Sequence, residues 1–397
     1  MKKIIVLGAG LYFKRTIQKL KEAGFYIIAT DRNENAEGAS VADEFHAIDI
    51  SDKEATLKLA VQSGVHGIMN LNEAGSRTAG YVSNQLKLNG HSYETVEATN
   101  DKGLMRDIWR KHNLSIPFYR VVNDVPELRK AINEIGYPCI LKPTDSGGSG
   151  RGISIIKEEA DIEWAFEFAK PFVKNKRFIV EEFIGGMEMT IEAFSKNGIV
   201  FILAVSDKIK PDLRTRVATS LNYPALLENT VLAKVKKLVS DAVIALGIQN
   251  GISHTEVIVD GQGSPFLVET AARGGGGHIF HTIIEAVSGI NAPVLQANWL
   301  VNDTDKITIS SIKQQGCCYR FFSTPHGILK EIQHIDSAKS IDGVLDFGIV
   351  KKIGEEVGNL ENSLQRPGFV VTKGKNREEA ISVADKVEAT LKFTVEK

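Results

Sequence analysis

The chain has 397 residues, of which 43% are hydrophobic and 24% charged, the proportions of an ordinary folded protein with room for about two to four domains. Lysine plus arginine (48) nearly balance aspartate plus glutamate (49), which excludes an overall field that would attract nucleic acid or an anionic membrane. Three cysteines cannot form a disulfide framework, and no apolar run suits a signal peptide or a membrane span. We therefore expect a cytoplasmic protein with no nucleic-acid or membrane partner.

An alternating pattern of short apolar runs and amphipathic segments occupies residues 3–87. Helices are predicted near residues 11–23 and 52–62, between apolar runs that have the length of strands. Because strands that alternate with helices are joined by crossover connections, this order predicts a Rossmann-like parallel sheet. The apolar runs are IIVLG, FYIIATD, EFHAID and GIMNLNE.

The loops after such strands are where an open parallel sheet binds ligands, which draws attention to Gly8–Gly10, Asp31 and Asn70–Glu73. GAGLYF looks like half of a dinucleotide-binding fingerprint, but Phe13 stands where a third glycine would let the helix pack closely on the strand. A tight turn without a ligand is therefore favoured over nicotinamide binding. An NAD-dependent dehydrogenase is the least favoured function.

The next part of the chain begins with two predicted helices and then changes to strands. The first helix covers NDKGLMRDIWRKHNL, from Asn100, and is expected to end at Ile116-Pro117, since a residue before proline avoids the helical region. A second helix near Val125–Ile135 leads to the strand YPCILKP, which contains Lys142. From there to about residue 197 the pattern predicts short strands in hairpin-like order.

The last part, from Arg320 onward, combines short strands in YRFFS, GVLDFGIV and RPGFVV with an amphipathic helix near Arg377–Leu391, which predicts a small α+β module. The fold class predicted for the whole chain is α/β plus α+β. We expect an N-terminal α/β domain (1–100), a subdomain with a glycine-rich loop (101–195, core 115–195), a catalytic subdomain (196–310) and a C-terminal module (311–397).

The segment DSGGSGRGIS, residues 145–154, has four glycines in six residues between two predicted strands. Glycines leave backbone amides uncovered, as in loops that cradle phosphate oxygens, although a flexible hairpin loop without a ligand is an equal alternative. Lys142 precedes the loop on an otherwise apolar strand, which favours a phosphate contact over snorkelling to solvent. Lys102 is more ambiguous, because an exposed lysine in a first helical turn is ordinary.

The stretch HTEVIVDGQGSPFLVETAAR, residues 254–273, contains two apolar strands joined by the turn DGQGS. A hairpin that pairs Val259 with Phe266 sets Glu256 opposite Glu269, where two like charges about 5 Å apart are destabilising. The pair therefore needs a counter-ion, and magnesium that bridges to substrate phosphates meets this need. Two solvent-facing glutamates on an ordinary hairpin are the alternative.

Arg273 and the run GGGGHI follow the second glutamate at once. Arginine presents a rigid fork suited to phosphate or carboxylate oxygens, and glycines such as Gly275 and Gly276 let a substrate approach the backbone. The histidines of this region do not have the spacing of a structural zinc site. They are His254, His278 and His281.

In chain order, these lysines, glycines, glutamates and the arginine resemble the ATP-grasp superfamily, and the resemblance covers nearly the whole chain. It implies that Glu256 and Glu269 hold magnesium and that Arg273, with Lys142 and Glu269, serves catalysis by stabilising acyl-phosphate and tetrahedral states. The adenine would lie against the hinge at 181–184, and a glycine-rich flap would close over the phosphates. The implied ATP contacts are Lys102, Lys142, Gly147, Gly148, Ser149, Gly150, Gly152, Glu181, Glu182, Phe183, Ile184 and Glu188.

VETAARGGGG resembles the carboxylate–amine ligase branch, which includes amino-acid ligases, more than the biotin carboxylases. Many members carry an asparagine two residues after the second metal glutamate, whereas Ala271 stands there in this chain. One or two magnesium ions are therefore both compatible, with manganese as a substitute. The resemblance implies an enzyme that activates a carboxylate as an acyl phosphate with ATP and couples it to an amine. An ATP-grasp carboxylase or carbamoyl-phosphate-type enzyme that uses bicarbonate is the alternative.

Substrate selection is expected to fall to the N-terminal loops, including Glu73 and Gly8–Gly10, and to the segment SDKIKPDLRTRVATSLNYP. In this segment Lys208, Arg214 and Arg216 either pair with a substrate carboxylate or form a solvated basic loop. No general base stands out, and His254 and Glu73 are the candidates. An amino acid, peptide or small metabolite is the expected substrate, and a homodimer is compatible with this interpretation.

Overall fold

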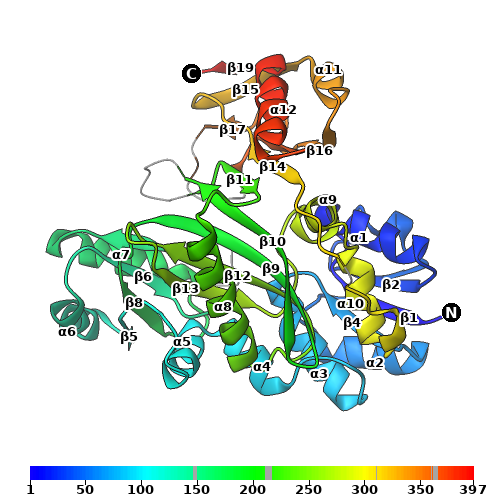
Figure 1. Cartoon of the computed structure of the whole chain (residues 1–397), viewed down its shortest axis with the longest axis horizontal. Coiled ribbons are helices and arrows are strands. Elements are labelled where there is room, and N and C mark those ends of the chain that lie inside the picture. Colours follow the sequence, from blue (N-terminus) through cyan, green and yellow to red (C-terminus); the bar gives the residue numbers. More distant parts are fainter. Residues whose placement is uncertain (146–149, 211–216, 310, 359, 361–364) are drawn as a thin grey trace.

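The computed structural model of the chain describes residues 1–145, 150–210, 217–309, 311–358, 360 and 365–397. Over these residues the strands form four sheets, of four, eight, three and four strands. Figure 1 shows the N-terminal domain on one side, a lobe of helices and strands on the other, and a C-terminal module above the long strands between them. The predicted combination of α/β and α+β architecture is confirmed.

The N-terminal domain contains a parallel sheet in the order β3-β2-β1-β4, as predicted. Alternate residues of β1 enter two cores, Ile4 and Val6 on the face covered by α1, and Ile5 and Leu7 on the face covered by α2 and α3. Its elements are β1 (Lys3–Leu7), α1 (Leu11–Glu22), β2 (Tyr26–Thr30), β3 (Glu44–His46), α2 (Lys53–Ser63), β4 (Gly67–Asn70), α3 (Ser76–Gln85) and α4 (Tyr93–Asn100).

The glycine turn after β1 is closed by the protein itself. Gly8 has a φ of +109°, and a Cβ atom there would come within 2.8 Å of the Phe13 ring, so both the backbone and the close packing require glycine. Asp31 accepts hydrogen bonds from the amides of Ala9 and Asn33, each at 3.0 Å. These contacts support the tight-turn interpretation and account for Asp31 without a nucleotide.

A segment distant in sequence completes this domain. Helix α9 (Ile284–Ser288) is followed by α10 (Ala292–Leu300), which packs against α1 and β4 (Figure 1). The contact with β4 is tight, because a Cβ atom on Gly67 would lie 2.9 Å from the Cβ of Leu300. The core of the N-terminal domain is therefore continuous with that of the large sheet.

Helix α5 (Lys102–Lys111) is shorter than predicted. Asp101 caps its N-terminus and accepts a hydrogen bond from the amide of Leu104 at 3.0 Å. It ends before Ile116-Pro117 because Asn113 adopts the left-handed conformation (φ +56°) and the amide of Leu114 bonds back to the Trp109 carbonyl. The expected end at the proline was therefore wrong.

The lobe beyond α5 contains an antiparallel sheet in the order β5-β8-β6-β7, with α6 and α7 on one face. Its elements are β5 (Tyr119–Val122), α6 (Val125–Ile135), β6 (Cys139–Pro143), β7 (Ser154–Ile156), α7 (Ile162–Ala169) and β8 (Phe178–Glu182). Helix α7 corrects the prediction of strands alone. Ile162, Ala165, Phe166 and Ala169 are all buried and have helical spacing.

The large antiparallel sheet has the order β13-β12-β9-β10-β11-β14-β18-β16. Its strands are β9 (Met187–Lys196), β10 (Ile199–Ile209), β11 (Ser220–Tyr223), β12 (Gly251–Val259), β13 (Pro265–Ala271), β14 (Gly316–Phe321), β16 (Val344–Ile349) and β18 (Gly368–Gly374), and helix α8 (Asn229–Ala245) packs against it. A boundary at residue 195 would divide the β9–β10 hairpin. We propose residues 183–186 instead, because this loop keeps each strand with its own sheet.

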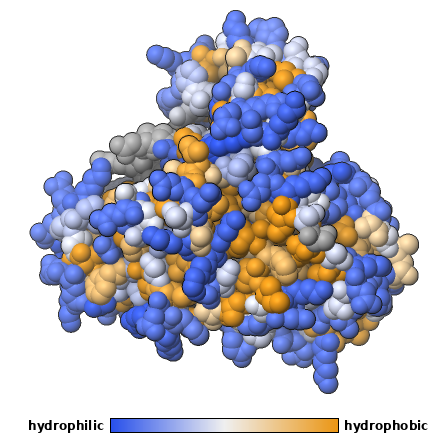
Figure 2. All heavy atoms as spheres, in the orientation of Figure 1, coloured by the Kyte–Doolittle hydropathy of each residue, from blue (hydrophilic) through white to orange (hydrophobic). Residues whose placement is uncertain are grey.

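The C-terminal module contributes β14, β16 and β18 to the large sheet and also forms a small sheet of its own. The small sheet contains β15 (Gly327–Gln333), β17 (Glu356–Val357) and β19 (Lys392–Glu396), accompanied by α11 (Ile335–Lys339) and α12 (Arg377–Thr390). Figure 2 shows apolar residues gathered over the middle of the visible face, where Figure 1 places β9 and β10. Among the described residues, none of the helices has both the length and the apolar character that crossing a membrane requires.

Candidate active site

A cavity of about 310 Å³ lies between the four-stranded antiparallel sheet and the eight-stranded one, and residues of the N-terminal domain and the C-terminal module also line it. Most of the predicted site residues meet there, although they come from positions up to 200 residues apart in the chain. The predicted residues that line it are Glu73, Lys102, Lys142, Gly150, Glu181, Glu182, Phe183, Ile184, Glu188, Lys208, His254, Glu256, Glu269 and Arg273.

Some predicted residues are not part of this wall. Gly152, Gly275 and Gly276 do not line the cavity. Gly152 packs instead beside Pro143 and Phe172, where a Cβ atom would lie 3.0 Å from either side chain. Gly147, Gly148, Ser149, Arg214 and Arg216 lie outside the described residues.

Both lysines predicted to contact phosphates are buried at the cavity wall. Lys102 is 5% exposed, and its Nζ lies 3.3 Å from Glu269. Lys142 is 7% exposed, and its Nζ lies 2.5 Å from Glu181. Neither lysine extends into solvent, so the ordinary explanations of an exposed first-turn lysine and a snorkelling strand lysine do not hold.

Glu181 joins Lys142 to an arginine that was not predicted. Arg106 Nε lies 2.6 Å from the Glu181 carboxylate, and its Nη2 donates to the Val268 carbonyl at 2.7 Å. Burial opposes ionisation of Glu181, but the charges of Arg106 and Lys142 outweigh it and lower the pKa of Glu181 to about 2. The signal for Arg106 is its spacing from Lys102, because residues four apart share one face of α5.

The two candidate metal ligands face each other on paired strands, as predicted. Glu256 pairs with Glu269, but Val259 pairs with Pro265 rather than with Phe266. A β-bulge beside Glu256 absorbs the difference and leaves Val268 as the extra residue. The predicted register of the turn was therefore wrong by one residue, while the opposition of the two carboxylates was right.

The donor chemistry of this pair fits magnesium. Two carboxylates on adjacent strands are the small set of protein oxygens that magnesium usually takes, with phosphates and water completing its shell. The described residues contain no cluster of three or more His, Cys, Asp or Glu side chains that could hold a metal by themselves.

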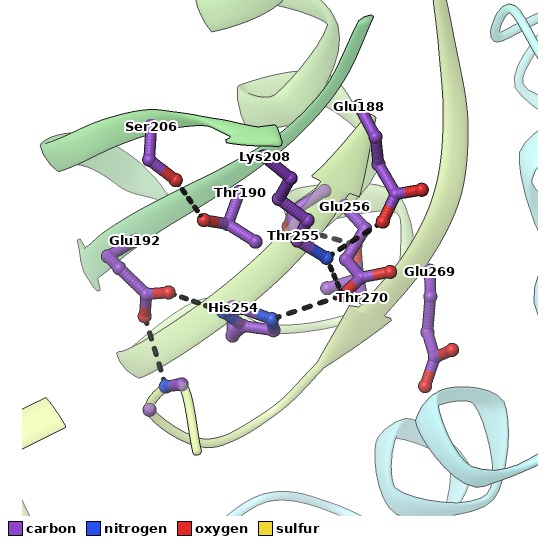
Figure 3. A network of polar contacts seen from close by, with 12 residues as sticks. Glu188, Thr190, Glu192, Ser206, Lys208, His254, Thr255, Glu256, Glu269 and Thr270 are labelled. Atoms are coloured by element: carbon purple, nitrogen blue, oxygen red, sulfur yellow. Dashed lines mark hydrogen bonds and ion pairs between the residues drawn. The ribbon is translucent and has the colours of Figure 1, made fainter. Parts of the chain in front are cut away.

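Lys208 bridges two glutamates (Figure 3). Its Nζ lies 2.8 Å from Glu188 and 2.5 Å from Glu256, and Lys210 also pairs with Glu188. Burial disfavours its charge, yet the two carboxylates raise the pKa of Lys208. Lys208 is thus paired with protein carboxylates, as Lys102 and Lys142 are, and its contact with a substrate carboxylate stays a prediction.

His254 lies between Glu192 and Glu256 (Figure 3). Burial disfavours the imidazolium, but the charges and hydrogen bonds of the two glutamates outweigh it and raise the pKa of His254 to about 9. A histidine already protonated at neutral pH cannot accept a proton, so His254 is a poor candidate for the general base. Glu192 was not predicted, although its alternation with Glu188 along β9 places both on one face.

Arg273 and Glu73 approach each other across the cavity. Arg273 Nη1 donates to the Gly274 carbonyl at 2.9 Å, and its Nη2 lies 3.8 Å from Glu73. Burial, and then the negative charge of Glu269, raise the pKa of Glu73. Glu73 is therefore the better of the two candidates for a general base.

Arg366, from the C-terminal module, is a further cation that was not predicted. Its guanidinium lies 3.4 Å above the Phe321 ring, and its Nη2 donates to the Ala218 carbonyl at 2.8 Å. Burial lowers the pKa of Arg366 to about 10. Within the described part of the chain it has no carboxylate within ion-pair distance, unlike the cavity lysines, Arg106 and Arg273.

Comparison with known proteins agrees with this geometry. The ATP-grasp domain model matches residues 135–282, and the model of L-amino acid ligase C-terminal domain 2 matches residues 320–396. The formate-dependent phosphoribosylglycinamide formyltransferase of Paraburkholderia xenovorans is 34% identical over 188 residues, 46% of each chain. That of Wolinella succinogenes is 32% identical over 264 residues, 65% of this chain and 66% of the relative. The matches thus span about half of the first relative's length and about two thirds of the second's.

Solved structures extend the likeness in fold to the whole chain. An L-amino acid ligase from Bacillus licheniformis superposes with a TM-score of 0.86 at 21% identity, covering 100% of this chain and 99% of that one. N5-carboxyaminoimidazole ribonucleotide synthetase from Thermotoga maritima has a TM-score of 0.77 at 21% identity, covering 100% of both chains. The chain therefore belongs to the ATP-grasp superfamily, with an ATP-grasp domain at residues 135–282 and an L-amino acid ligase C-terminal domain 2 at residues 320–396.

Proposed function

We propose that this chain is an ATP-dependent carboxylate–amine ligase that acts on an amino acid, peptide or small metabolite and releases ADP and phosphate. The observation that carries the proposal is the single cavity in which two buried lysines, two facing glutamates and an arginine converge. This set matches what phosphoryl transfer to a carboxylate requires: positive groups for the phosphates, oxygen ligands for magnesium, and a rigid donor for the reacting oxygens.

ATP would lie with its phosphates between Lys102 and Lys142 and with its ribose near Glu188. The adenine would lie against the hinge at the end of β8. There the amides of Glu182 and Phe183 donate to the carbonyls of Phe118 and Pro138. The remaining hinge amide, that of Ile184, is therefore the proposed donor to the purine. Apolar side chains that line the same cavity, Ile140, Ile153 and Ile258, would pack on its faces.

Glu256 and Glu269 would hold magnesium between the protein and the phosphates. Bound there, the ion would neutralise charge on the phosphoryl oxygens. Two carboxylates suffice for one ion, and a second would take most of its ligands from the nucleotide. Manganese is expected to substitute because it favours the same oxygen ligands.

The reaction would proceed in two steps. A substrate carboxylate oxygen attacks the terminal phosphorus of ATP, which breaks the bond to ADP and forms an acyl phosphate. The amine then attacks the acyl carbon, and phosphate leaves as the amide forms. Arg273 would stabilise the oxygen that gains charge in the second step. Glu73, with its raised pKa and its place beside Arg273, would accept the proton that the amine loses.

The charges at the cavity wall favour substrates that carry both an ammonium and a carboxylate group. Glu73 provides a buried carboxylate for an ammonium group. Arg366 provides a cation that no carboxylate of the described residues pairs with, and a planar carboxylate suits its fork. These two residues, at opposite ends of the chain, support amino acids or peptides over simple acids. A cytoplasmic location without nucleic-acid or membrane partners belongs to the same proposal.

The test is release of phosphate and ADP from magnesium ATP across a panel of amino-acid pairs, with bicarbonate added or withheld, followed by mass spectrometry of the products. ADP release that requires two amino acids and yields an amide would establish the ligase and identify its substrates. Release that requires bicarbonate would overturn the ligase in favour of a carboxylase. Sedimentation of the same sample would determine whether the chain is a homodimer.

A further inference from the structure

A chain of three side chains links the glycine loop after Arg273 to the metal-binding strand (Figure 3). Glu192 on β9 lies opposite His254 on β12 in the register of the sheet. One oxygen of Glu192 contacts Nδ1 of His254, and the other accepts the amide of Gly275 at 3.1 Å. The Nε2 of His254 lies 3.7 Å from Glu256.

The glycine loop at 274–277 packs directly against Glu192 and His254. A Cβ atom on Gly275 would lie 2.7 Å from Glu192 Oε1 and 2.9 Å from His254 Nδ1, so any larger residue at this position would force these two side chains to shift. Arg273 holds the start of the same loop through the Gly274 carbonyl. The loop continues into a π-helical segment, Ile279–Ile283, a rare conformation that is frequent at functional sites.

Glu192 cannot act on a ligand itself. It is completely buried, it does not line the cavity, and both of its oxygens are used by protein groups. His254 does line the cavity, and its two nitrogens point to two carboxylates that serve different elements. The pair therefore has one arm on the loop that carries Arg273 and one arm on the strand that carries Glu256.

We propose that Glu192 and His254 are positioning residues that fix the glycine loop at 274–277, and with it Arg273, relative to the metal ligand Glu256. This inference rests on the proposed function, in which Glu256 serves phosphoryl transfer and Arg273 serves attack on the acyl phosphate. Both steps use the same acyl group, so the two elements have to keep one separation. The pair maintains it through the hydrogen bond from the Gly275 amide to Glu192 and the ion pair between His254 and Glu256.

Substitutions of His254 can remove its contact with Glu192 or its contact with Glu256 separately. Asparagine overlaps the Cβ, Cγ and Nδ1 atoms of histidine, so His254→Asn keeps the contact with Glu192 and loses the arm to Glu256. Glutamine extends to the place of Nε2, so His254→Gln keeps the arm to Glu256 and loses the one to Glu192. In Glu192→Gln, one carboxylate oxygen is replaced by an NH2 group. This NH2 group has to face either His254 or the backbone amide of Gly275, and in either place two hydrogen-bond donors oppose each other.

Two measurements that need no turnover report on the arms. The first is the magnesium concentration required for tight binding of ADP, measured by calorimetry. His254→Asn is expected to raise it about 10-fold, the usual effect of removing a partner of a metal ligand, and His254→Gln to leave it unchanged. The second is hydrogen exchange of the peptide that contains residues 274–277, which should be faster in His254→Gln and Glu192→Gln but unchanged in His254→Asn.

Thr190→Val is the matched control. Thr190 lies on β9 between Glu188 and Glu192 and opposite Glu256 in the register of the sheet, but its hydroxyl shares a buried hydrogen bond of 2.5 Å with Ser206 and takes no part in the contacts of Glu192 and His254 (Figure 3). It should lower stability while leaving both measurements as in wild type. If the two His254 variants behave alike, or match the control, the proposal is overturned. An inactive wild-type protein across all substrates would instead overturn the ligase, because the two measurements are made without turnover.

Discussion

Replacement of Glu181 by glutamine gives a quantitative test of the two buried ion pairs that Glu181 forms with Arg106 and Lys142. The carboxylate is 1% exposed and lies 2.6 Å from Arg106 and 2.5 Å from Lys142. Glutamine keeps the shape and removes the charge. The lowering of the Glu181 pKa from 4.5 to about 2 corresponds to about 3 kcal/mol of folding stability at neutral pH.

The sign of the pH dependence follows from the direction of this shift. Because the pKa of Glu181 is lower in the folded than in the unfolded chain, the stabilisation is present above about pH 4.5 and is lost as the pH falls toward about 2. Urea-unfolding free energies of wild type and Glu181→Gln, followed by circular dichroism, should differ by about 3 kcal/mol at about pH 7. The difference should shrink to less than half of that at about pH 3.

An exposed ion pair provides the control for this experiment. Glu167 on α7 lies 2.9 Å from Lys170, and its side chain is 64% exposed. Glu167→Gln should change the unfolding free energy by less than about 1 kcal/mol, since such pairs are weak in water. A difference between wild type and Glu181→Gln that stays constant from about pH 7 to about pH 3 would refute the reasoning. It would mean that lost packing, not the ionised carboxylate, carries the effect.

Three further substitutions address the proposed chemistry. Glu269→Gln should leave the urea midpoint nearly unchanged and reduce magnesium-dependent ADP formation about 100-fold or more, since a metal ligand matters at least as much as its outer partners; normal turnover would contradict the metal assignment. Lys142→Ala should weaken ATP binding at least about 10-fold in calorimetry, or about 1.4 kcal/mol, and an unchanged affinity would exclude its phosphate role. Arg366→Gln should raise KM about 10-fold for one substrate and not for ATP, because the lost guanidinium contact is worth about 1.4 kcal/mol to a carboxylate. Steady-state kinetics with each substrate varied in turn would measure this. If the variant has the same KM values as the wild-type protein, Arg366 has no such role.

Local patterns were enough to predict much of the fold. The parallel sheet of the N-terminal domain follows from apolar runs that alternate with helices, and α6 begins and ends at the residues expected, Val125 and Ile135. The end of α5 could not be placed, because the left-handed Asn113 acts before the proline that the pattern offered as a stop. The eight-stranded sheet also escaped prediction, since the pairing of β11 with β14 joins residues about 100 positions apart.

The site was predictable where its residues are close in sequence. Glu256 and Glu269 belong to one hairpin, so the alternation of their strands places them on one face even though the bulge at Val268 is invisible in the sequence. Arg106 and Glu192 were missed, although each lies four residues from a predicted residue on the same element. Arg366 could not have been found in this way, because it belongs to the C-terminal module and only the tertiary structure brings it to the cavity.

The pairing of charges at the cavity wall links the two ligands that the site is proposed to bind. Each candidate metal carboxylate lies beside a lysine, Glu269 beside Lys102 and Glu256 beside Lys208. A magnesium ion alone would be repelled by these lysines, and a nucleotide alone would be repelled by the carboxylates. If the two bound together, Glu256 and Glu269 would hold the ion and Lys102 would contact phosphate oxygens, so no buried charge would lose its partner. In the proposed site, binding of the metal and of the nucleotide would therefore be coupled by the protein's own ion pairs, and the proposed positioning of Glu256 by His254 would bear on both.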